Sequence, residues 1–267
     1  MILEVDVGNT RLKWRLLSVG NTGADGVSAG NVIERGFVMT ETLTSVHSVN
    51  LCFGNIAASR LTMIRIGTVV GSQRELLALW AAQYSLVPMF AQTSVSCGAV
   101  VNAYDDVDQM GVDRWLGIVA AYSKVKSACL IIDAGSAVTI DLVDNGGRHL
   151  GGYIVPGLQM MRHSLFGQTD QVESNAEKTS TANVSFALSP GKNTQAAVAN
   201  GLPLMLIGMI QRLLLDVQAA YDISPFVILT GGDGAFLERL IHDELAMSME
   251  FVPELVMDGL SLVEYER

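Results

Sequence analysis

Charged residues and cysteines are both scarce in this chain of 267 residues, and each shortage excludes a class of protein. Charged residues make up 16% and hydrophobic residues 49%, a balance that argues against a disordered chain or a coiled coil. The formal net charge is −10, so non-specific binding to nucleic acid or to an anionic membrane is disfavoured. An anionic nucleotide can still bind where a site supplies amides, cations and a metal ion. The length allows one large domain or two of ordinary size.

Cysteine usage and the lack of long apolar runs bear on location. The chain has no Cys-x-x-Cys pair, and its three scattered cysteines are Cys52, Cys97 and Cys129. This pattern predicts reduced thiols in a cytoplasmic protein and argues against a structural zinc site. The N-terminal sequence has neither the basic nor the apolar region of a signal peptide. The longest apolar run, 202–210, falls far short of the roughly 20 residues that span a bilayer, so we expect no membrane partner.

Two common nucleotide-binding motifs are absent as well. No Gly-x-x-x-x-Gly-Lys-Ser/Thr occurs, which excludes a P-loop, and no Gly-x-Gly-x-x-Gly follows the first predicted strand, which disfavours a dinucleotide fold. The chain has instead three short glycine turns after apolar, strand-like segments, near residues 8, 135 and 231. In open α/β sheets, ligands collect beyond the carboxyl ends of such strands.

The first glycine turn is Asp6-Val-Gly-Asn-Thr10. Residues 2–7 have the composition of a buried strand and residues 11–17 alternate as a second strand. Gly8-Asn9 between them is a strong hairpin signal, because both residues tolerate the positive φ of tight hairpin turns. Turn amides, a hydroxyl and the nearby Lys13 suit phosphate oxygens, and the Asp6 carboxylate suits a hard metal ion such as Mg²⁺. An ordinary N-terminal hairpin without a ligand fits the same residues.

A second stretch, 128–143, repeats the first at an offset of 127 residues (133 − 6). Asp133 aligns with Asp6, and the glycines and the polar residues that follow also align: Gly135 with Gly8, and Ser136 with Asn9. Each copy is a buried strand, an Asp-x-Gly-polar turn and a second strand. A repeat at nearly half the chain length predicts a duplicated domain. The two turns are then expected to face each other across a cleft, where the third turn, Thr230-Gly-Gly232, would help to clamp ATP.

The remaining segments predict alternating strands and helices. We expect strands at 32–40, 63–70, 85–91, 150–157 and 226–230, helices at 73–84, 111–126, 158–166, 191–221 and 235–245, and loops at 92–110 and 169–190. Asp113 falls near a helix N-terminus, where a carboxylate can simply cap free amides. His163 fits a partly exposed helix position. Met205 and Met209, at i, i+4 spacing, fit either the core or a subunit contact.

Taken in order, these segments resemble the type III pantothenate kinases of the acetate and sugar kinase/Hsp70/actin superfamily. The matching segments span nearly the whole chain: Asp6-Val-Gly-Asn-Thr10 with Lys13, Asn102-Ala-Tyr104, Gly111-Val-Asp-Arg114, Asp133-Ala-Gly-Ser136, Gly151-Gly-Tyr-Ile-Val-Pro-Gly157, Gly191-Lys-Asn-Thr194 through Gly201, and Thr230-Gly-Gly232. The resemblance implies an α/β fold of two duplicated actin-like, ribonuclease-H-like domains with a nucleotide cleft between them. The domains would span 1–115 and 116–267.

The resemblance also implies an activity, which is ATP-dependent phosphorylation of pantothenate to 4′-phosphopantothenate in the first step of coenzyme A synthesis. It implies ATP with Mg²⁺ and a monovalent cation, K⁺ or NH₄⁺, as cofactors. It further implies a cytoplasmic homodimer with the pantothenate pocket near the subunit interface.

The site residues carry over by position. The ATP-binding residues implied are Asp6, Val7, Gly8, Asn9, Thr10, Arg11, Leu12, Lys13, Ser136, Gly231 and Gly232. The pantothenate-binding residues implied are Tyr104, Gly111, Val112, Asp113, Arg114 and Thr194. Asp113 corresponds to the proton acceptor and Asp133 to the monovalent-cation ligand, while Asp6 is assigned to Mg²⁺ from its chemistry. Ser136 departs from the family's more usual Thr but keeps the hydroxyl.

Two alternatives remain open at this point. A sugar kinase of the same superfamily would share the phosphate hairpins, although the Cys-rich zinc motif and the Glu-x-Gly-His segment of the repressor/kinase type are absent here. A non-catalytic relative acting as a regulator would share the fold, although the net charge of −10 disfavours direct DNA contact.

Overall fold

The computed structural model describes residues 1–19, 29–53, 56, 60–166, 188–244 and 248–266. The chain divides into two compact units, of which the first is Met1–Ala120 with Leu255–Arg267 and the second is Ala121–Glu254. The ranges expected from the sequence, 1–115 and 116–267, place the C-terminal segment in the second unit instead. That segment instead belongs to the first unit and begins with a short helix. No strand pattern or repeat in the sequence indicated this.

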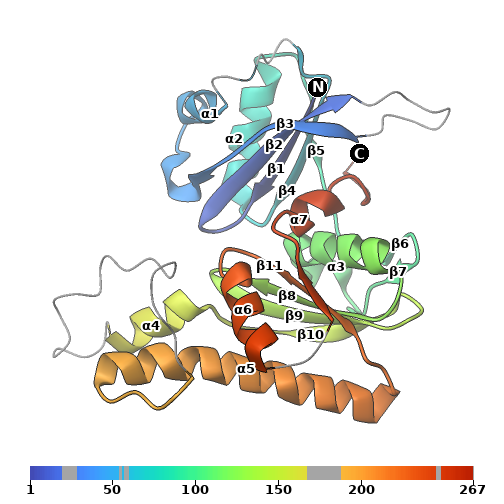
Figure 1. Cartoon of the computed structure of the whole chain (residues 1–267). Helices are drawn as coiled ribbons and strands as arrows, with labels where there is room; N and C mark the ends of the chain where they lie inside the picture. Colours follow the sequence, from blue (N-terminus) through green and yellow to red (C-terminus); the bar gives the residue numbers. More distant parts are fainter. Residues whose placement is uncertain (20–28, 54–55, 57–59, 167–187, 245–247, 267) are drawn as a thin grey trace. The chain divides into compact units, whose positions relative to one another are not determined.

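The first unit contains a five-stranded sheet in the order β3-β2-β1-β4-β5. Its strands are β1 (Ile2–Val7), β2 (Arg11–Val19), β3 (Ala29–Met39), β4 (Met63–Thr68) and β5 (Met89–Phe90). β2 runs antiparallel to both β1 and β3, whereas β4 is parallel to both β1 and β5. Alternate residues of β1, including Leu3 and Val5, form a core with Leu77 and Trp80 of helix α2 (Gly71–Ala82). Helix α1 (Val46–Cys52) packs against α2 (Figure 1).

The second unit repeats this sheet strand for strand, in the order β10-β9-β8-β11-β12. Its strands are β8 (Cys129–Ala134), β9 (Ala137–Val143), β10 (His149–Pro156), β11 (Phe226–Thr230) and β12 (Met249–Phe251). The antiparallel and parallel pairings recur in the same places. Helices α4 (Leu158–Phe166), α5 (Thr194–Tyr221) and α6 (Gly234–Glu244) contribute to its core. The duplicated α/β fold predicted from the repeat is therefore confirmed.

Several short elements lie outside the sequence-based expectation. The expected loop at 92–110 contains a small hairpin, β6 (Ser96–Cys97) with β7 (Val100–Val101), and the 3-10 turn η3 (Val107–Gln109). Two-residue strands carry too few positions for an alternating pattern to be visible. Helix α3 (Val112–Val125) follows, and the short pieces η1 (Thr40–Thr42) and α7 (Leu255–Gly259) were not predicted. Most of the expected loop at 169–190 lies outside the described residues.

Both predicted hairpins form, but the backbone of the first differs from the one expected. Among the described residues, Gly8 and Asn9 are not in the positive-φ region, and neither is Gly135. The first turn places Asn9 and Thr10 at its tip and is closed by the Gly8 amide, which donates to the Arg11 carbonyl at 3.0 Å. The hairpin prediction is therefore correct, but the positive φ on which it was based does not occur at Gly8 or Asn9.

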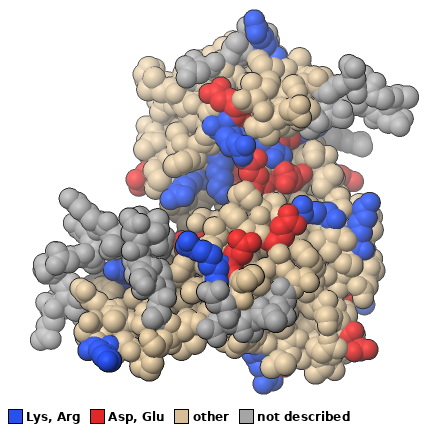
Figure 2. All heavy atoms as spheres, in the orientation of Figure 1, with Lys and Arg blue, Asp and Glu red and all other residues tan. Residues whose placement is uncertain are grey.

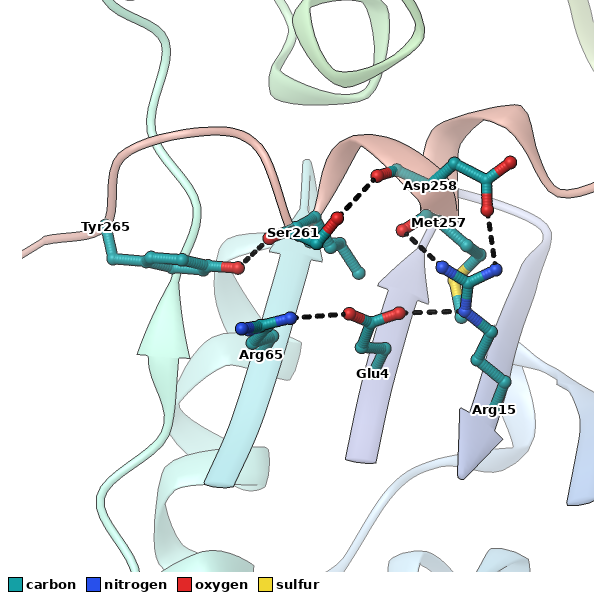
Figure 3. A network of polar contacts seen from close by, with 8 residues as sticks. Glu4, Arg15, Arg65, Met257, Asp258, Ser261 and Tyr265 are labelled. Atoms are coloured by element: carbon teal, nitrogen blue, oxygen red, sulfur yellow. Dashed lines mark hydrogen bonds and ion pairs between the residues drawn. The ribbon is translucent and has the colours of Figure 1, made fainter. Parts of the chain in front are cut away.

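A buried ion-pair network ties the C-terminal segment to the sheet of the first unit (Figure 3). Glu4 is fully buried on β1, and its two carboxylate oxygens accept from Arg15 Nε at 2.8 Å and from Arg65 Nη1 at 3.1 Å. Arg15 also donates to Asp258 Oδ1 at 2.7 Å and to the Met257 carbonyl at 3.0 Å, both in α7. Burial lowers the pKa of Arg15, but the Glu4 and Asp258 carboxylates more than offset this and raise it above its ordinary value.

The tail beyond α7 extends the same contact. Tyr265 forms a bridge with Ala91, the Gln92 amide donates to the Glu264 carbonyl, and the Glu266 amide donates to the Phe90 carbonyl. The Tyr265 hydroxyl donates to the Leu260 carbonyl, and burial raises its pKa. The tail therefore covers the edge of the sheet just beyond β5.

Helix α5 is the longest helix in the part of the chain that the structure describes, with 28 residues. It is long and apolar enough to cross a membrane. The core helix of a soluble protein meets the same criteria of length and composition. Pro203 lies inside it, and its buried face consists of Pro203, Leu206, Ile207, Ile210 and Val217.

On the molecular face in Figure 2, acidic and basic side chains are interspersed over a mostly uncharged surface. That distribution is consistent with the low charged fraction of the sequence.

Candidate functional site

The first candidate element is the β1–β2 hairpin. Asp6 and Lys13 are direct cross-strand partners on its two strands, so an acid and a base stand side by side next to the turn. Asn9, Thr10 and Arg11 are exposed at the tip. Thr40, just after β3, fixes this turn, because its hydroxyl donates to the Gly8 carbonyl at 2.8 Å and its amide donates to the Thr10 carbonyl at 3.0 Å. Nothing in the sequence around Thr40 indicated this role, because Thr40 was predicted as the last residue of a strand.

The second element is the segment that leads into α3. The Arg114 guanidinium donates from Nη1 to the Tyr104 hydroxyl at 2.7 Å and lies 5.5 Å from the centre of the Tyr104 ring. Both side chains are half-buried, so a pre-ordered guanidinium is presented near the surface. An arginine fork held in this way suits a carboxylate, which it can bind through two parallel hydrogen bonds.

Asp113 lies in the first turn of α3, as the sequence predicted, and its carboxylate has a defined position. Its Oδ1 accepts from the Arg114 amide at 2.8 Å, which is a favourable place for a negative charge at a helix N-terminus. A Cβ atom at Gly111 would come within 2.6 Å of the same Oδ1. Gly111 therefore leaves room for the carboxylate, and a larger residue there would displace it.

Both elements of the first unit lie at the carboxyl ends of its parallel strands. The Val69 amide, just beyond β4, donates to the Val7 carbonyl at the end of β1 at 3.3 Å. The Cα of Gly111 faces the Val69 side chain, which would lie 4.0 Å from an added Cβ. The predicted substrate residues of α3 and the predicted phosphate hairpin are thus brought to the same edge of the sheet, where α/β proteins bind ligands.

In the second unit, the structure brings together Asp133, the second hairpin and the Gly-Gly turn. Thr230 pairs with Asp133 across β11 and β8, and the Asp233 amide donates to the Ala134 carbonyl at 2.8 Å. Gly231 has φ +89°, and a Cβ there would lie 2.4 Å from both the Asp133 Oδ1 and the Ala134 carbonyl oxygen. Only glycine allows this close approach, so the Gly-Gly turn predicted to contact nucleotide also encloses the Asp133 carboxylate.

The tip of the second hairpin is supported from the other side. The Gly157 amide donates to the Ser136 carbonyl at 3.0 Å, and a Cβ at Gly157 would lie 2.2 Å from the Gly135 carbonyl oxygen. Ser136 itself is exposed at the turn. Thr194 begins α5 in the same unit, next to its N-cap Asn193, whose side chain accepts from the Ala196 amide at 2.8 Å. Thr194 therefore belongs to a different unit from Tyr104 and Arg114.

The positions of the acidic side chains limit how a metal ion could bind. In the described ranges of the chain, no group of three or more His, Cys, Asp or Glu side chains is placed to hold a metal ion. A metal bound here would need oxygens from a ligand or water besides the protein, which is typical of Mg²⁺ on a nucleotide.

Solved structures share this fold at low sequence identity. A Campylobacter jejuni protein named as a Baf family transcriptional activator superposes with a TM-score of 0.58 and 18% identity, over 97% of this chain and 95% of that one. The activator of the 2-hydroxyisocaproyl-CoA dehydratase from Clostridium difficile, solved with bound ADPNP, gives a TM-score of 0.53 and 10% identity, over 98% and 92%. With its two duplicated sheets, the chain belongs to the class of proteins with paired α/β units whose fold these structures share.

Sequence comparison narrows this class to one family. A family model described as type III pantothenate kinase matches residues 2–216. A type III pantothenate kinase of Pseudomonas savastanoi pv. phaseolicola is 36% identical over 265 residues, and one of Pseudomonas aeruginosa PAO1 is 37% identical over 265 residues, each covering 98% of both chains. The chain belongs to the type III pantothenate kinase family, and the resemblance drawn from its motifs is confirmed.

Proposed function

We propose that this chain transfers the γ-phosphoryl group of ATP to the hydroxyl of pantothenate, forming 4′-phosphopantothenate for coenzyme A synthesis. One observation carries the proposal beyond family membership. Arg114 is held by Tyr104 directly beside Asp113, so a carboxylate-binding group and a proton-accepting group stand next to each other at the start of α3. Pantothenate carries both a carboxylate and a primary hydroxyl, and this pair of residues suits the two groups.

The chemistry assigns a role to the predicted site residues of both units. Phosphoryl transfer passes through a loose transition state, so positioning and charge neutralisation supply most of the catalysis. Asp113 orients the attacking hydroxyl and accepts its proton late in the reaction. Lys13 and the turn amides of the β1–β2 hairpin hold phosphate oxygens, and Ser136 and the Gly231–Gly232 turn hold ATP from the second unit. Asp6 would hold the Mg²⁺ of the nucleotide, and the bound ion would offset phosphate charge.

The test is an ADP-release assay with pantothenate, ATP, Mg²⁺ and K⁺. We expect pantothenate-dependent turnover by the wild-type chain, and a loss of at least about 100-fold in kcat for Asp113→Asn with an unchanged KM for ATP. Asp108→Asn, an exposed acid in the segment before α3, is the matched control and should retain full turnover. Near-normal turnover of Asp113→Asn would exclude Asp113 as the proton acceptor.

The same assay addresses the cations. Asp133 is the proposed ligand of K⁺ or NH₄⁺, and the close approach of Gly231 to its carboxylate supports a site for a weakly hydrated cation there. Asp133→Ala should remove the dependence of kcat on K⁺ and keep the dependence on Mg²⁺, measured by titrating each ion separately. Loss of Mg²⁺ dependence with K⁺ dependence retained would reverse the assignments of Asp6 and Asp133.

A homodimer is also proposed, and the exposed face of α5 supports it. Opposite its buried face, α5 carries a stripe of exposed apolar and small residues at helical spacing: Gly201, Leu204, Met205 and Gly208. Leu204 and Met205 are 49% and 52% exposed, which a second copy of the helix would cover. Light scattering should give a dimer mass for the wild type and a monomer for Leu204→Glu. Leu79→Glu, at a 62% exposed leucine of α2, should leave the dimer intact.

The assay also decides between this proposal and its rivals. Turnover with hexoses but not with pantothenate would indicate a sugar kinase of the same superfamily. No turnover with any acceptor in the presence of K⁺ would favour a regulatory role, which is the role in the name of the similar Campylobacter jejuni protein. The proposed reaction fits a soluble enzyme that acts in the cytoplasm and has no nucleic-acid or membrane partner.

A further inference from the structure

Asn102 occupies a junction in the first unit that the proposed reaction does not by itself explain. Its side-chain Nδ2 donates to the Ser94 carbonyl at 3.3 Å, and its Oδ1 accepts from the Tyr104 amide at 3.0 Å. Its backbone amide donates to the Val95 carbonyl at 2.9 Å. The half-buried side chain therefore bridges the start of the β6–β7 hairpin and the chain that leads on to Tyr104.

The Asn102–Tyr104 contact is the first step of a short relay. Oδ1 of an Asn that accepts the amide two residues ahead closes an Asx-turn, which fixes the backbone at that residue. Here the fixed residue is Tyr104, whose hydroxyl accepts from Arg114 Nη1 at 2.7 Å. Because an arginine side chain has many rotamers, the position of its guanidinium depends on the groups that hold it. Tyr104 is such a group, and Asn102 sets where the Tyr104 backbone lies.

The side chain of Asn102 is not needed to hold the β6–β7 hairpin together. The hairpin has its own pairs, Ser96 with Val101 and Cys97 with Val100. Cys97 Sγ also contacts the Leu262 carbonyl at 3.0 Å. The backbone bond from Asn102 to Val95 survives any substitution of the side chain except proline. Replacing the side chain thus removes two hydrogen bonds, one to the Ser94 carbonyl and one from the Tyr104 amide.

We propose that Asn102 is a positioning residue for the acceptor substrate. It orders Tyr104, and through Tyr104 it fixes the direction in which Arg114 presents its guanidinium to the substrate carboxylate. The inference rests on the proposed function, since it assigns the carboxylate of pantothenate to Arg114. Asn102 touches neither the substrate hydroxyl nor ATP in this scheme, so it affects binding of the carboxylate and leaves the transfer step unchanged.

The experiment compares Asn102→Leu and Asn102→Asp with the wild type. Asn102→Leu removes both side-chain hydrogen bonds at similar volume, and we expect its KM for pantothenate to rise by about tenfold, the scale of one or two lost hydrogen bonds. Its kcat and its KM for ATP should stay within about twofold of the wild type. Asn102→Asp keeps an oxygen to accept from the Tyr104 amide, so it should recover most of the pantothenate affinity. Ser94→Ala is the control, because it leaves the Ser94 carbonyl in place.

A second substrate separates positioning of Arg114 from general damage. In the alcohol analogue of pantothenate, a CH₂OH group replaces the carboxylate, so the ratio of KM values between Asn102→Leu and the wild type should fall close to one. An equal rise in KM for both substrates, a parallel loss of ATP affinity, or an unchanged KM for pantothenate would each overturn the inference while wild-type turnover stands. Absence of pantothenate-dependent turnover by the wild type would overturn the proposed function, and this inference with it.

Discussion

Glu4 offers the sharpest test of what holds the first unit together. It is fully buried, and both of its oxygens accept from guanidiniums whose side chains are only 9% exposed. In Glu4→Gln the shape is kept but the charge is lost, so Arg15 and Arg65 remain buried with one carboxylate fewer. Removing one partner of a buried ion pair typically costs about 3–5 kcal/mol, because the remaining charge stays desolvated.

The magnitude for this substitution lies at the lower end of that range. The Gln oxygen still accepts from one guanidinium, and Asp258 still neutralises part of the Arg15 charge, although its own side chain is 48% exposed. We therefore expect the unfolding free energy of the first unit to fall by about 3 kcal/mol. For a chain of this size, 1 kcal/mol corresponds to roughly 2–4 °C, so the melting temperature should fall by about 6–12 °C.

Tryptophan fluorescence during urea unfolding is a suitable assay, because all three tryptophans, Trp14, Trp80 and Trp115, lie in the first unit. The matched control is Asp216→Asn, which breaks the exposed pair between Arg212 and Asp216 on α5 and should leave the urea midpoint essentially unchanged. If Glu4→Gln unfolds at the same urea concentration as Asp216→Asn, the ion-pair network does not stabilise the sheet and the reasoning fails.

Three further outcomes are expected. Gly231→Ala forces a Cβ into contact with the Asp133 carboxylate at a positive φ, so calorimetry should show a loss of about 1–3 kcal/mol, and K⁺ activation should weaken. Burial raises the pKa of Cys52 from 9.0 to about 11, so its alkylation by iodoacetamide at pH 8, followed by mass spectrometry, should be about 100-fold slower than in the unfolded chain. Burial also raises the pKa of Cys129 from 9.0 to about 12. Because the thiol of the unfolded chain loses its proton at a lower pH than the buried thiol, the free energy of unfolding is unaffected well below pH 9 and falls as the pH rises further, so urea midpoints should fall between pH 8 and pH 10.

The duplicated architecture could be predicted because the two halves contain similar short sequence segments. Each half begins with an apolar strand, an Asp-x-Gly turn and a second strand, and the matching offset between Asp6 and Asp133 relates them. The structure gives both halves the same strand order, so this prediction is confirmed together with the family. The residue roles carried over from the family remain predictions, although Asp113, Arg114 and Tyr104 do lie in contact or next to one another.

Other features depend on contacts between residues that are distant in the sequence, and no local pattern reveals them. Thr40 supports the first phosphate hairpin from the end of β3, and nothing around it distinguishes it from other strand threonines. Gly231 was predicted to contact nucleotide, but its positive φ and its approach to Asp133 are visible only when β11 is paired with β8. The short helix α7 gave no periodic signal, so the return of the chain to the first unit was missed.

That return has a consequence for the order in which the protein can fold during synthesis. Arg15 is made early, but its partner Asp258 follows 243 positions later, after the whole second unit has been translated. Until then the guanidinium of Arg15 and the edge beyond β5 lack the groups that cover them. The first unit to emerge from the ribosome is therefore the last to be completed, and the second unit can finish folding before it.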